Sequence, residues 1–140
     1  METMPNLLKG WLDGSISPPP IVRLLHIELI SCEEGISRAE MRVGKDHHNP
    51  MGIVHGGIFC DLADVAMGTA LASILAENET FTTTDIGAHY FVTIQEGLLV
   101  AEARVIRRGK TTAYVECDLM DGEKRLVAKL NSTCLIRIRS

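Results

Sequence analysis

One carboxylate stands in an apolar stretch of the chain, shortly after a His-Gly-Gly turn. Asp64 has Leu, Ala and Val residues on both sides, and no Lys or Arg lies within four residues of it. Burying an ionised carboxylate among aliphatic side chains is unfavourable unless the charge is paired or solvated. Asp64 therefore lies either on a polar stripe that faces solvent or in a partly wet cleft, where it could act on a substrate.

The Gly56-Gly57 pair offers complementary chemistry a few residues earlier. At the start of a helix, unpaired backbone N–H groups and the positive end of the helix dipole point outward, and glycines let a ligand approach them closely. Such donors suit a carbonyl oxygen that becomes an oxyanion. Plain turn chemistry is the alternative explanation of two adjacent glycines.

The spacing of these two features has a consequence for assembly. Gly56 and Asp64 are eight residues apart, which is about 12 Å along a helix at roughly 1.5 Å per residue. Within one chain they cannot both reach the same carbonyl group. Two such helices running antiparallel across a two-fold axis would bring Gly56 of one chain to Asp64 of the other. The spacing predicts a homodimer with two equivalent sites.

The elements that must position these residues can be traced along the chain. Residues 1–20 form an N-terminal extension with a short amphipathic helix over 5–13, which Gly14 and the three prolines at 18–20 end. Residues 21–140 form the main domain. Residues 58–76 lack strand alternation and are apolar on most sides, so they predict a long enclosed helix. Strands are predicted at 26–31, 37–43, 81–92, 98–106, 112–120 and 126–138.

This order of elements defines the fold class. Strands before and after one apolar helix, without βαβ alternation, predict an α+β fold in which an antiparallel sheet wraps around a long central helix. The free edges of such a sheet also favour a dimer.

Composition excludes several classes of function. The net charge is −4 and no basic block occurs, which argues against nucleic-acid binding. No run of 18 apolar residues predicts a membrane span. The four cysteines lack zinc-binding spacing, so no metal site is expected. The sequence predicts no signal peptide, and free thiols in a reducing cytoplasm are the favoured interpretation.

The motif residues resemble a known family. Asn49-Pro50-Met51-Gly52, His55-Gly56-Gly57 and Leu62-Ala63-Asp64 match the pattern N-x-x-G-x-x-H-G-G-x(4)-L-x-D. This is the signature of hotdog-fold acyl-CoA thioesterases, in the phenylacetyl-CoA thioesterase-like subgroup related to 4-hydroxybenzoyl-CoA thioesterases. The resemblance extends from about residue 20 to 138, and it includes the strand that carries Thr83.

The resemblance implies a hotdog fold, a homodimer that pairs into a homotetramer, and hydrolysis of an acyl-CoA without a cofactor. Asp64 would activate water or attack the thioester directly. The Gly56 N–H would polarise the carbonyl, helped by Asn49, while Thr83 would hold the water. His55 would lie near the carbonyl or brace the loop. A thiolate is a good leaving group, so a serine triad is not needed.

Further residues are candidates for substrate binding. Gly57 lies beside the expected oxyanion site, and the side chains of Ile58, Phe59 and Met67 are candidates for the acyl pocket. Arg108 and Lys110 could hold the phosphates of coenzyme A, although charges that flank a turn are commonly just solvated surface.

Two rival functions remain open at this point. Asp46, Asn49-Pro50 and His55 resemble the Asp-x-Asn-Pro-x-His pattern of hotdog enoyl-CoA hydratases, but here His55 follows Pro50 by five positions instead of two. The second rival is a non-catalytic acyl-CoA-binding protein, against which the retained Asp64 argues. The sequence does not decide the acyl group, the choice between nucleophile and base at Asp64, or the choice between dimer and tetramer.

Overall fold

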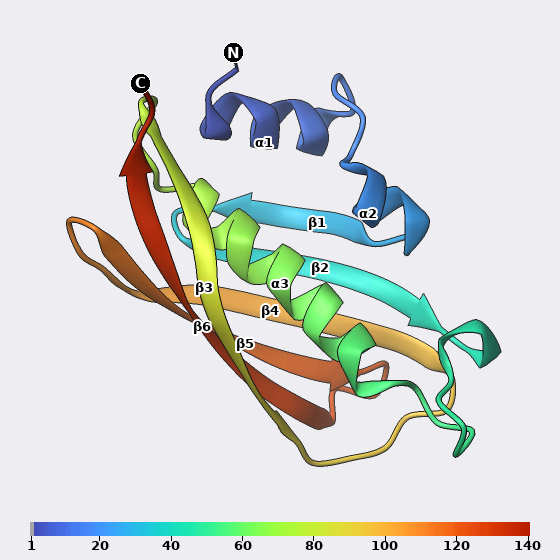
Figure 1. Cartoon of the computed structure of the whole chain (residues 1–140). Helices are drawn as coiled ribbons and strands as arrows, with labels where there is room; N and C mark the ends of the chain where they lie inside the picture. The colour runs from blue at the N-terminus through green and yellow to red at the C-terminus, as the bar shows by residue number, and fades with distance from the viewer. Residues whose placement is uncertain (1) are drawn as a thin grey trace.

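An antiparallel sheet curves around one long helix in the computed structural model, which describes residues 2–140 (Figure 1). The six strands lie in the order β1-β2-β4-β5-β6-β3, and every pairing is antiparallel. The predicted architecture is confirmed. The strand bounds are Glu28–Glu33 (β1), Ile36–Val43 (β2), Glu79–Tyr90 (β3), Gly97–Arg108 (β4), Thr112–Asp121 (β5) and Leu126–Ile138 (β6).

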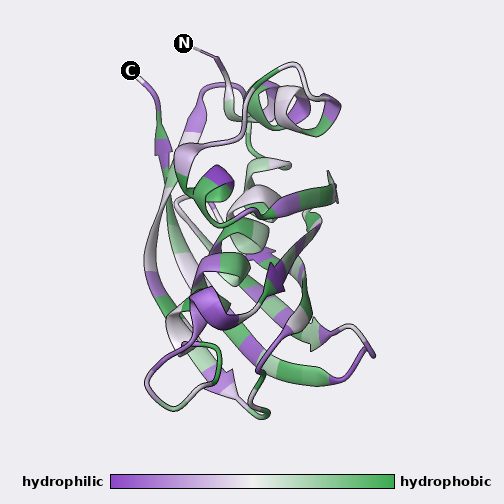
Figure 2. Ribbon diagram, turned by 90° about the vertical axis from the view of Figure 1, so that its right-hand side faces the viewer, coloured by the Kyte–Doolittle hydropathy of each residue, from purple (hydrophilic) through white to green (hydrophobic). Residues whose placement is uncertain are grey.

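Alternating hydropathy fixes which face of the sheet covers the core. In β2, Ala39, Met41 and Val43 are buried and alternate with more accessible residues, as expected for a strand with one buried face. Figure 2 shows this alternation of apolar and polar residues along the strands. The β1–β2 hairpin turns at Glu34 and Gly35, which both have positive φ, the geometry that suits the twist of a tight hairpin.

The long helix α3 spans Gly56–Ala72 and contacts all six strands. Its Leu62, Met67 and Leu71 are fully buried in the core. The sequence predicted a helix over 58–76, so the predicted boundaries were wrong at both ends. The chain beyond Ala72 tightens into i to i−3 hydrogen bonds, a common way for a helix to end.

The outer face of α3 is only partly covered. Gly57, Asp61 and Asp64 are exposed in the single chain. The sequence predicted an enclosed helix, and this is true of the face toward the sheet but not of the outer face. The N-terminal segment covers part of the other half of the helix. Its helix α1 spans Met4–Asp13 and packs against α3 and β1.

The short elements around this core are few. Helix α2 spans Pro20–Leu24, and a single 3₁₀ turn, η1, spans Lys45–His47 in the loop before α3. Both chain ends lie on the same side of the molecule, close to α1 (Figures 1 and 2). All four cysteines are free thiols. Within residues 2–140, no helix is long and apolar enough to cross a membrane.

The edge strand β3 contains an irregularity that matters for the site. Thr83 pairs with Cys134 and Asp85 pairs with Thr133, so Thr84 is an extra residue without a partner. The Asp85 carboxylate accepts a hydrogen bond from the Thr133 N–H, and the Thr84 hydroxyl donates to the Thr133 carbonyl. These bonds hold a β-bulge, which shifts the in-and-out alternation of the strand by one residue.

Candidate active site

The carboxylate of Asp64 lies in the middle of α3 and faces β3. The Thr83 hydroxyl donates a hydrogen bond to its Oδ1 at 3.5 Å, a long contact. Within residues 2–140 no cation forms a salt bridge with it. The carboxylate therefore keeps free lone pairs, which could accept a proton.

The surroundings of Asp64 raise the pKa of its carboxyl group. The main cause is partial burial between protein elements, and the Asp61 charge one turn earlier adds repulsion, while the Thr83 bond acts in the opposite direction. Part of the hydration shell is lost although the side chain still meets solvent in the single chain. A carboxyl group shifted in this direction is a better proton acceptor when ionised.

The first turn of α3 presents the expected hydrogen-bond donors. His55 is the N-cap, and its side chain makes no capping bond. The N–H groups of Gly56 and Gly57 find no acceptor among the described residues. At a helix N-terminus such groups favour negative charge. They could stabilise the oxyanion of a tetrahedral intermediate.

Tyr90 supports this turn from the end of β3. The Tyr90 hydroxyl donates to the Gly56 carbonyl at 2.7 Å. A Cβ on Gly56 would lie only 3.1 Å from the hydroxyl oxygen of Tyr90. Its ring also packs on Phe59, with the centroids 5.4 Å apart. Burial, and then the neighbouring Cys60, raise the pKa of Tyr90 to about 12. The phenol thus stays protonated and remains a donor at neutral pH.

Tyr90 was not among the residues predicted from the sequence. Thr83 and Tyr90 are seven residues apart, so strict strand alternation would put them on opposite faces. The bulge at Thr84 removes this conflict, and both side chains reach α3. No signal in the sequence marks the bulge beyond a run of Thr and Asp in the strand.

The loop before α3 holds the other two predicted catalytic residues. The side-chain oxygen of Asn49 accepts a hydrogen bond from the Met51 N–H at 2.9 Å. The side-chain NH₂ group of Asn49 is therefore free to donate. The ring of His55 lies against Gly57, since a Cβ there would be 3.2 Å from its Cδ2. Both residues lie near the start of α3, and their roles stay predictions.

The predicted acyl-pocket residues have different environments. Phe59 and Met67 belong to the hydrophobic core, with 3% and 0% of their surface exposed. Ile58 is half-buried and packs against that core, while Gly57 is exposed. Because Met67 is fully enclosed in the folded chain, a direct contact with a substrate would require the core to open. The part of these residues in binding stays a prediction.

The two predicted phosphate-binding cations lie at the far end of the fold. Arg108 ends β4 and forms an ion pair with Glu79, which also accepts the Ala76 N–H at 2.8 Å. Those two contacts, the backbone bond first, hold the pKa of Glu79 below its usual range. Lys110 is exposed in the turn that follows. Glu79 begins β3 and Tyr90, which contacts Gly56, ends it. Arg108 and Lys110 therefore lie at the opposite end of β3 from Gly56 of the same chain.

Comparison with known proteins identifies the family. A model of the thioesterase superfamily matches residues 51–128, more than half of the chain. The chain therefore belongs to the thioesterase superfamily and is a thioester hydrolase, which confirms the class that the motif residues indicated.

Three similar proteins illustrate the range of this family. The 1,4-dihydroxy-2-naphthoyl-CoA hydrolase of Listeria monocytogenes is 30% identical over 81% of this chain and 90% of its own length. Acyl-coenzyme A thioesterase 13 of Pongo abelii is 31% identical over 66% of each protein. The E. coli PaaI protein shares the fold, with a TM-score of 0.82 and 21% identity over 95% of both chains. The hotdog fold is thereby confirmed.

Proposed function

We propose that this protein hydrolyses an acyl-CoA thioester to a free acid and coenzyme A. The observation that carries the proposal is the Asp64 carboxylate, which has a raised pKa, a Thr83 hydroxyl beside it and no salt bridge to a cation in the described part of the chain. The names of two relatives, a naphthoyl-CoA hydrolase and an acyl-coenzyme A thioesterase, support coenzyme A as the thiol.

The chemistry follows from the groups at the site. Asp64 accepts a proton from a water molecule while the water oxygen attacks the thioester carbon, and Thr83 orients that water. The carbonyl oxygen becomes an oxyanion next to the Gly56 N–H, where the helix dipole stabilises it. When the carbonyl re-forms, the C–S bond breaks and the thiolate leaves. A thiol has a pKa of roughly 8 to 9, so the thiolate needs little protonation to depart.

Direct attack by the carboxylate is the alternative route, through a mixed anhydride. A single turnover in water enriched in ¹⁸O tests for an anhydride that water opens at the Asp64 carbonyl. General-base catalysis places the heavy oxygen in the released acid and none in Asp64. If water instead attacked a mixed anhydride at the carbonyl carbon of the Asp64 side chain, the heavy oxygen would remain in the Asp64 carboxylate.

The site is built from two chains in this proposal. Gly56 and Asp64 are eight positions apart on one continuous helix, about 12 Å along its axis. The exposed outer face of α3 and the unpaired edge of β3 leave room for a second copy. A homodimer with antiparallel α3 helices would supply Gly56 from one chain and Asp64 from the other, and pairs of dimers would give a tetramer.

A thiol-release assay with a panel of acyl-CoA esters tests the activity. We expect turnover by the wild-type protein and a fall in kcat of about 100-fold or more in Asp64→Ala, the size expected when a catalytic base is lost. Asp61→Asn, one turn away on the same helix, is the matched control and should change kcat by less than about threefold. Equal background rates in wild type and Asp64→Ala would favour an acyl-CoA-binding protein. Hydration of an enoyl-CoA without thiol release would favour a hydratase.

Mixing two inactive variants tests the shared site. Asp64→Asn lacks the carboxylate, and Gly56→Val places a side chain against Tyr90 at the oxyanion donor. After the two are unfolded together and refolded, half of the dimers are mixed, and each mixed dimer holds one intact site. The mixture should recover about a quarter of wild-type activity. A site confined to one chain would give no recovery.

A further inference from the structure

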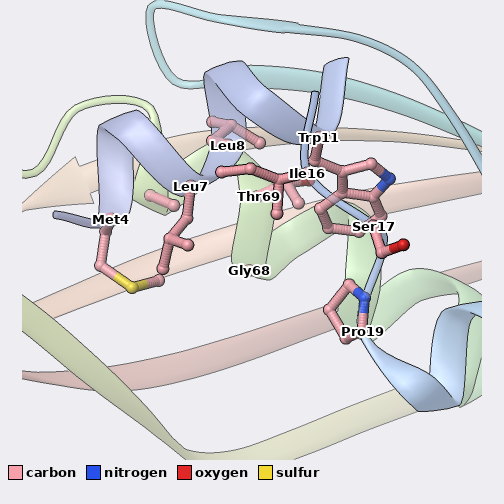
Figure 3. A pocket seen from close by; sticks show the side chains of 10 residues that line it. Met4, Leu7, Leu8, Trp11, Ile16, Ser17, Pro19, Gly68 and Thr69 are labelled. Carbon is pink, nitrogen blue, oxygen red and sulfur yellow. The ribbon is translucent and has the colours of Figure 1, made fainter. Parts of the chain in front are cut away.

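A cavity of about 190 Å³ lies between α1 and the C-terminal half of α3. Gly68, Thr69 and Ala72 of α3 form its floor. Figure 3 shows the side chains of α1 and of the segment after it gathered over this floor. The roof is made by Met4, Leu7, Leu8, Trp11 and Ile16.

The lining of this cavity is almost entirely apolar. The one polar side chain on its floor, Thr69, already donates to the Val65 carbonyl at 2.8 Å and shares a hydrogen bond of 2.7 Å with Ser37. Ser17, on the loop side, is exposed. A charged or strongly hydrogen-bonding ligand would find no partner inside, whereas an apolar group would lose only its contact with water.

The cavity begins one helical turn beyond the candidate catalytic carboxylate. Gly68 is four residues after Asp64, so the two lie on the same face of α3, about 6 Å apart along the axis. Gly68 has no side chain to fill this interval. A thioester whose carbonyl lies at Asp64 can therefore direct its acyl group along α3 and under Trp11.

We propose that this cavity receives the acyl group of the substrate and that α1 sets the size of that group; the inference rests on the function proposed above. A cavity of about 150 Å³ lined by aliphatic and aromatic residues holds a benzene molecule. The volume of 190 Å³ therefore suits an apolar acyl group of about six to eight carbon atoms. Helix α1 lies outside residues 51–128, which match the family model.

The roof is a built structure and is held in place by several local features. Thr3 caps α1 by accepting from the Asn6 N–H, and Gly14 ends the helix with φ of 82°. The Ile16 side chain folds back onto Gly10, where an added Cβ would overlap with the Ile16 Cδ1. The Ile16 N–H also donates to the Gly10 carbonyl at 3.0 Å. Such a preformed wall can select a substrate by size.

Trp11 gives a direct binding test that requires no turnover, since it is the only tryptophan of the chain. The Asp64→Asn protein is titrated with hexanoyl-CoA, with phenylacetyl-CoA and with free coenzyme A while tryptophan emission is recorded. Both acyl-CoA esters should shift the emission in a saturable manner, and coenzyme A alone should not. Emission that is unchanged by the esters, or changed equally by coenzyme A, would overturn the assignment of the cavity.

The second test compares values of kcat/KM for butyryl-, hexanoyl-, octanoyl-, dodecanoyl- and phenylacetyl-CoA. Trp11→Ala enlarges the cavity and should raise the ratio of dodecanoyl to hexanoyl turnover by about tenfold, which corresponds to about 1.4 kcal/mol. Gly68→Ala narrows the entrance and should shift the preference toward butyryl-CoA. A Cβ at Gly68 meets Phe81 at 3.4 Å, and alanine favours a helix, so this variant should fold even if Trp11→Ala does not.

Leu7 and Leu12 provide a matched control pair. Both lie on α1 and both are 38% exposed, but only Leu7 lines the cavity. Leu7→Ala should shift the chain-length profile toward longer esters, and Leu12→Ala should leave it as in the wild type. If all four variants released thiol with the chain-length profile of the wild type, the cavity proposal would be overturned and the proposed function would not. No thiol release by the wild type from any ester would instead contradict the proposed function.

Discussion

Two carboxylates near α3 have opposite environments. Glu79, beyond the end of the helix, is 7% exposed, accepts the Ala76 N–H and pairs with Arg108, and its pKa is lowered. Asp64, in the middle of the helix, is exposed in the single chain and has one long contact to Thr83. It has no salt-bridge partner among residues 2–140, and its pKa is raised. Glu79, which joins the end of the helix to the sheet, is therefore fully paired, whereas Asp64 is almost unpaired.

We infer from this difference that Glu79 has a structural role and that Asp64 is a candidate for a functional one. Ionised Glu79 is stabilised by the fold, so it contributes to stability at neutral pH. Ionised Asp64 is disfavoured by its surroundings, and a chain selected for stability alone would have little reason to keep it. A carboxylate with a raised pKa at an accessible position is typical of an active site.

The largest expected effect is on the rate. Asp64→Asn removes the proton acceptor and should lower kcat by about 100-fold or more. Glu79→Gln should leave kcat within about threefold, because Glu79 lies far from Gly56 along β3. Thiol release by the two purified variants, each shown to be folded by circular dichroism, measures this contrast. Similar losses in both variants would show that the two carboxylates do not differ in function.

The second effect is on stability, where Glu79→Gln should have a larger effect than Asp64→Asn. Glu79→Gln weakens charge-assisted hydrogen bonds and should lower the free energy of unfolding by about 2 kcal/mol at pH 7. The folded pKa of Glu79 is lowered, so its contribution is present at neutral pH and is lost as pH falls below about 4. Urea unfolding at pH 7 and at pH 3.5 should therefore show a difference that shrinks in acid. Asp64→Asn is the matched control and should not lower stability at pH 7.

Tyr90→Phe should have a smaller effect on the rate. The variant keeps the ring on Phe59 and loses only the hydroxyl that bonds to the Gly56 carbonyl. A hydrogen bond of this kind contributes about 1 kcal/mol, so kcat/KM should fall about fivefold with a melting temperature close to that of the wild type. A large fall in melting temperature would instead assign the hydroxyl to folding.

The smallest effect is expected from Asp61→Asn. The Asp61 charge raises the pKa of Asp64, although less than burial does. Removing it should move the acidic limb of the profile of kcat/KM against pH to lower pH, since Asp64 must be ionised to accept a proton. A limb that moves to higher pH would contradict the assigned repulsion.

Much of the fold could be predicted because its signals are local. Alternating apolar residues located three strands, and β-rich composition between turn signals located the other three, all within a few residues. The apolar run after the Gly56-Gly57 pair located the long helix, with its start placed two residues late. The predicted helix end at residue 76 was wrong, since Ser73 bonds to the Ala70 carbonyl and to the Gly35 N–H and the helix stops before it. That contact joins segments far apart in the sequence, so no local pattern reveals it.

The candidate site could be predicted only in part for the same reason. Residue types and their neighbours along the chain were enough to choose Gly56 and Asp64 as candidates. Tyr90 was missed because the bulge at Thr84 reverses the alternation of β3, and the bulge depends on pairing with Thr133. The cavity under α1 was missed because it exists only where Trp11 meets the outer face of α3.

The most direct test of the contrast between the two carboxylates is a titration of both in one sample. Carbon-13 NMR of the side-chain carboxyl carbons, with Asp64 and Glu79 assigned by single substitutions, gives both pKa values in the native assembly. We predict that Asp64 titrates above the range of a free aspartate and Glu79 below that of a free glutamate. An Asp64 that titrates at or below the free value would contradict the account, because the carboxylate would then be stabilised as an ion and poorly suited to accept a proton.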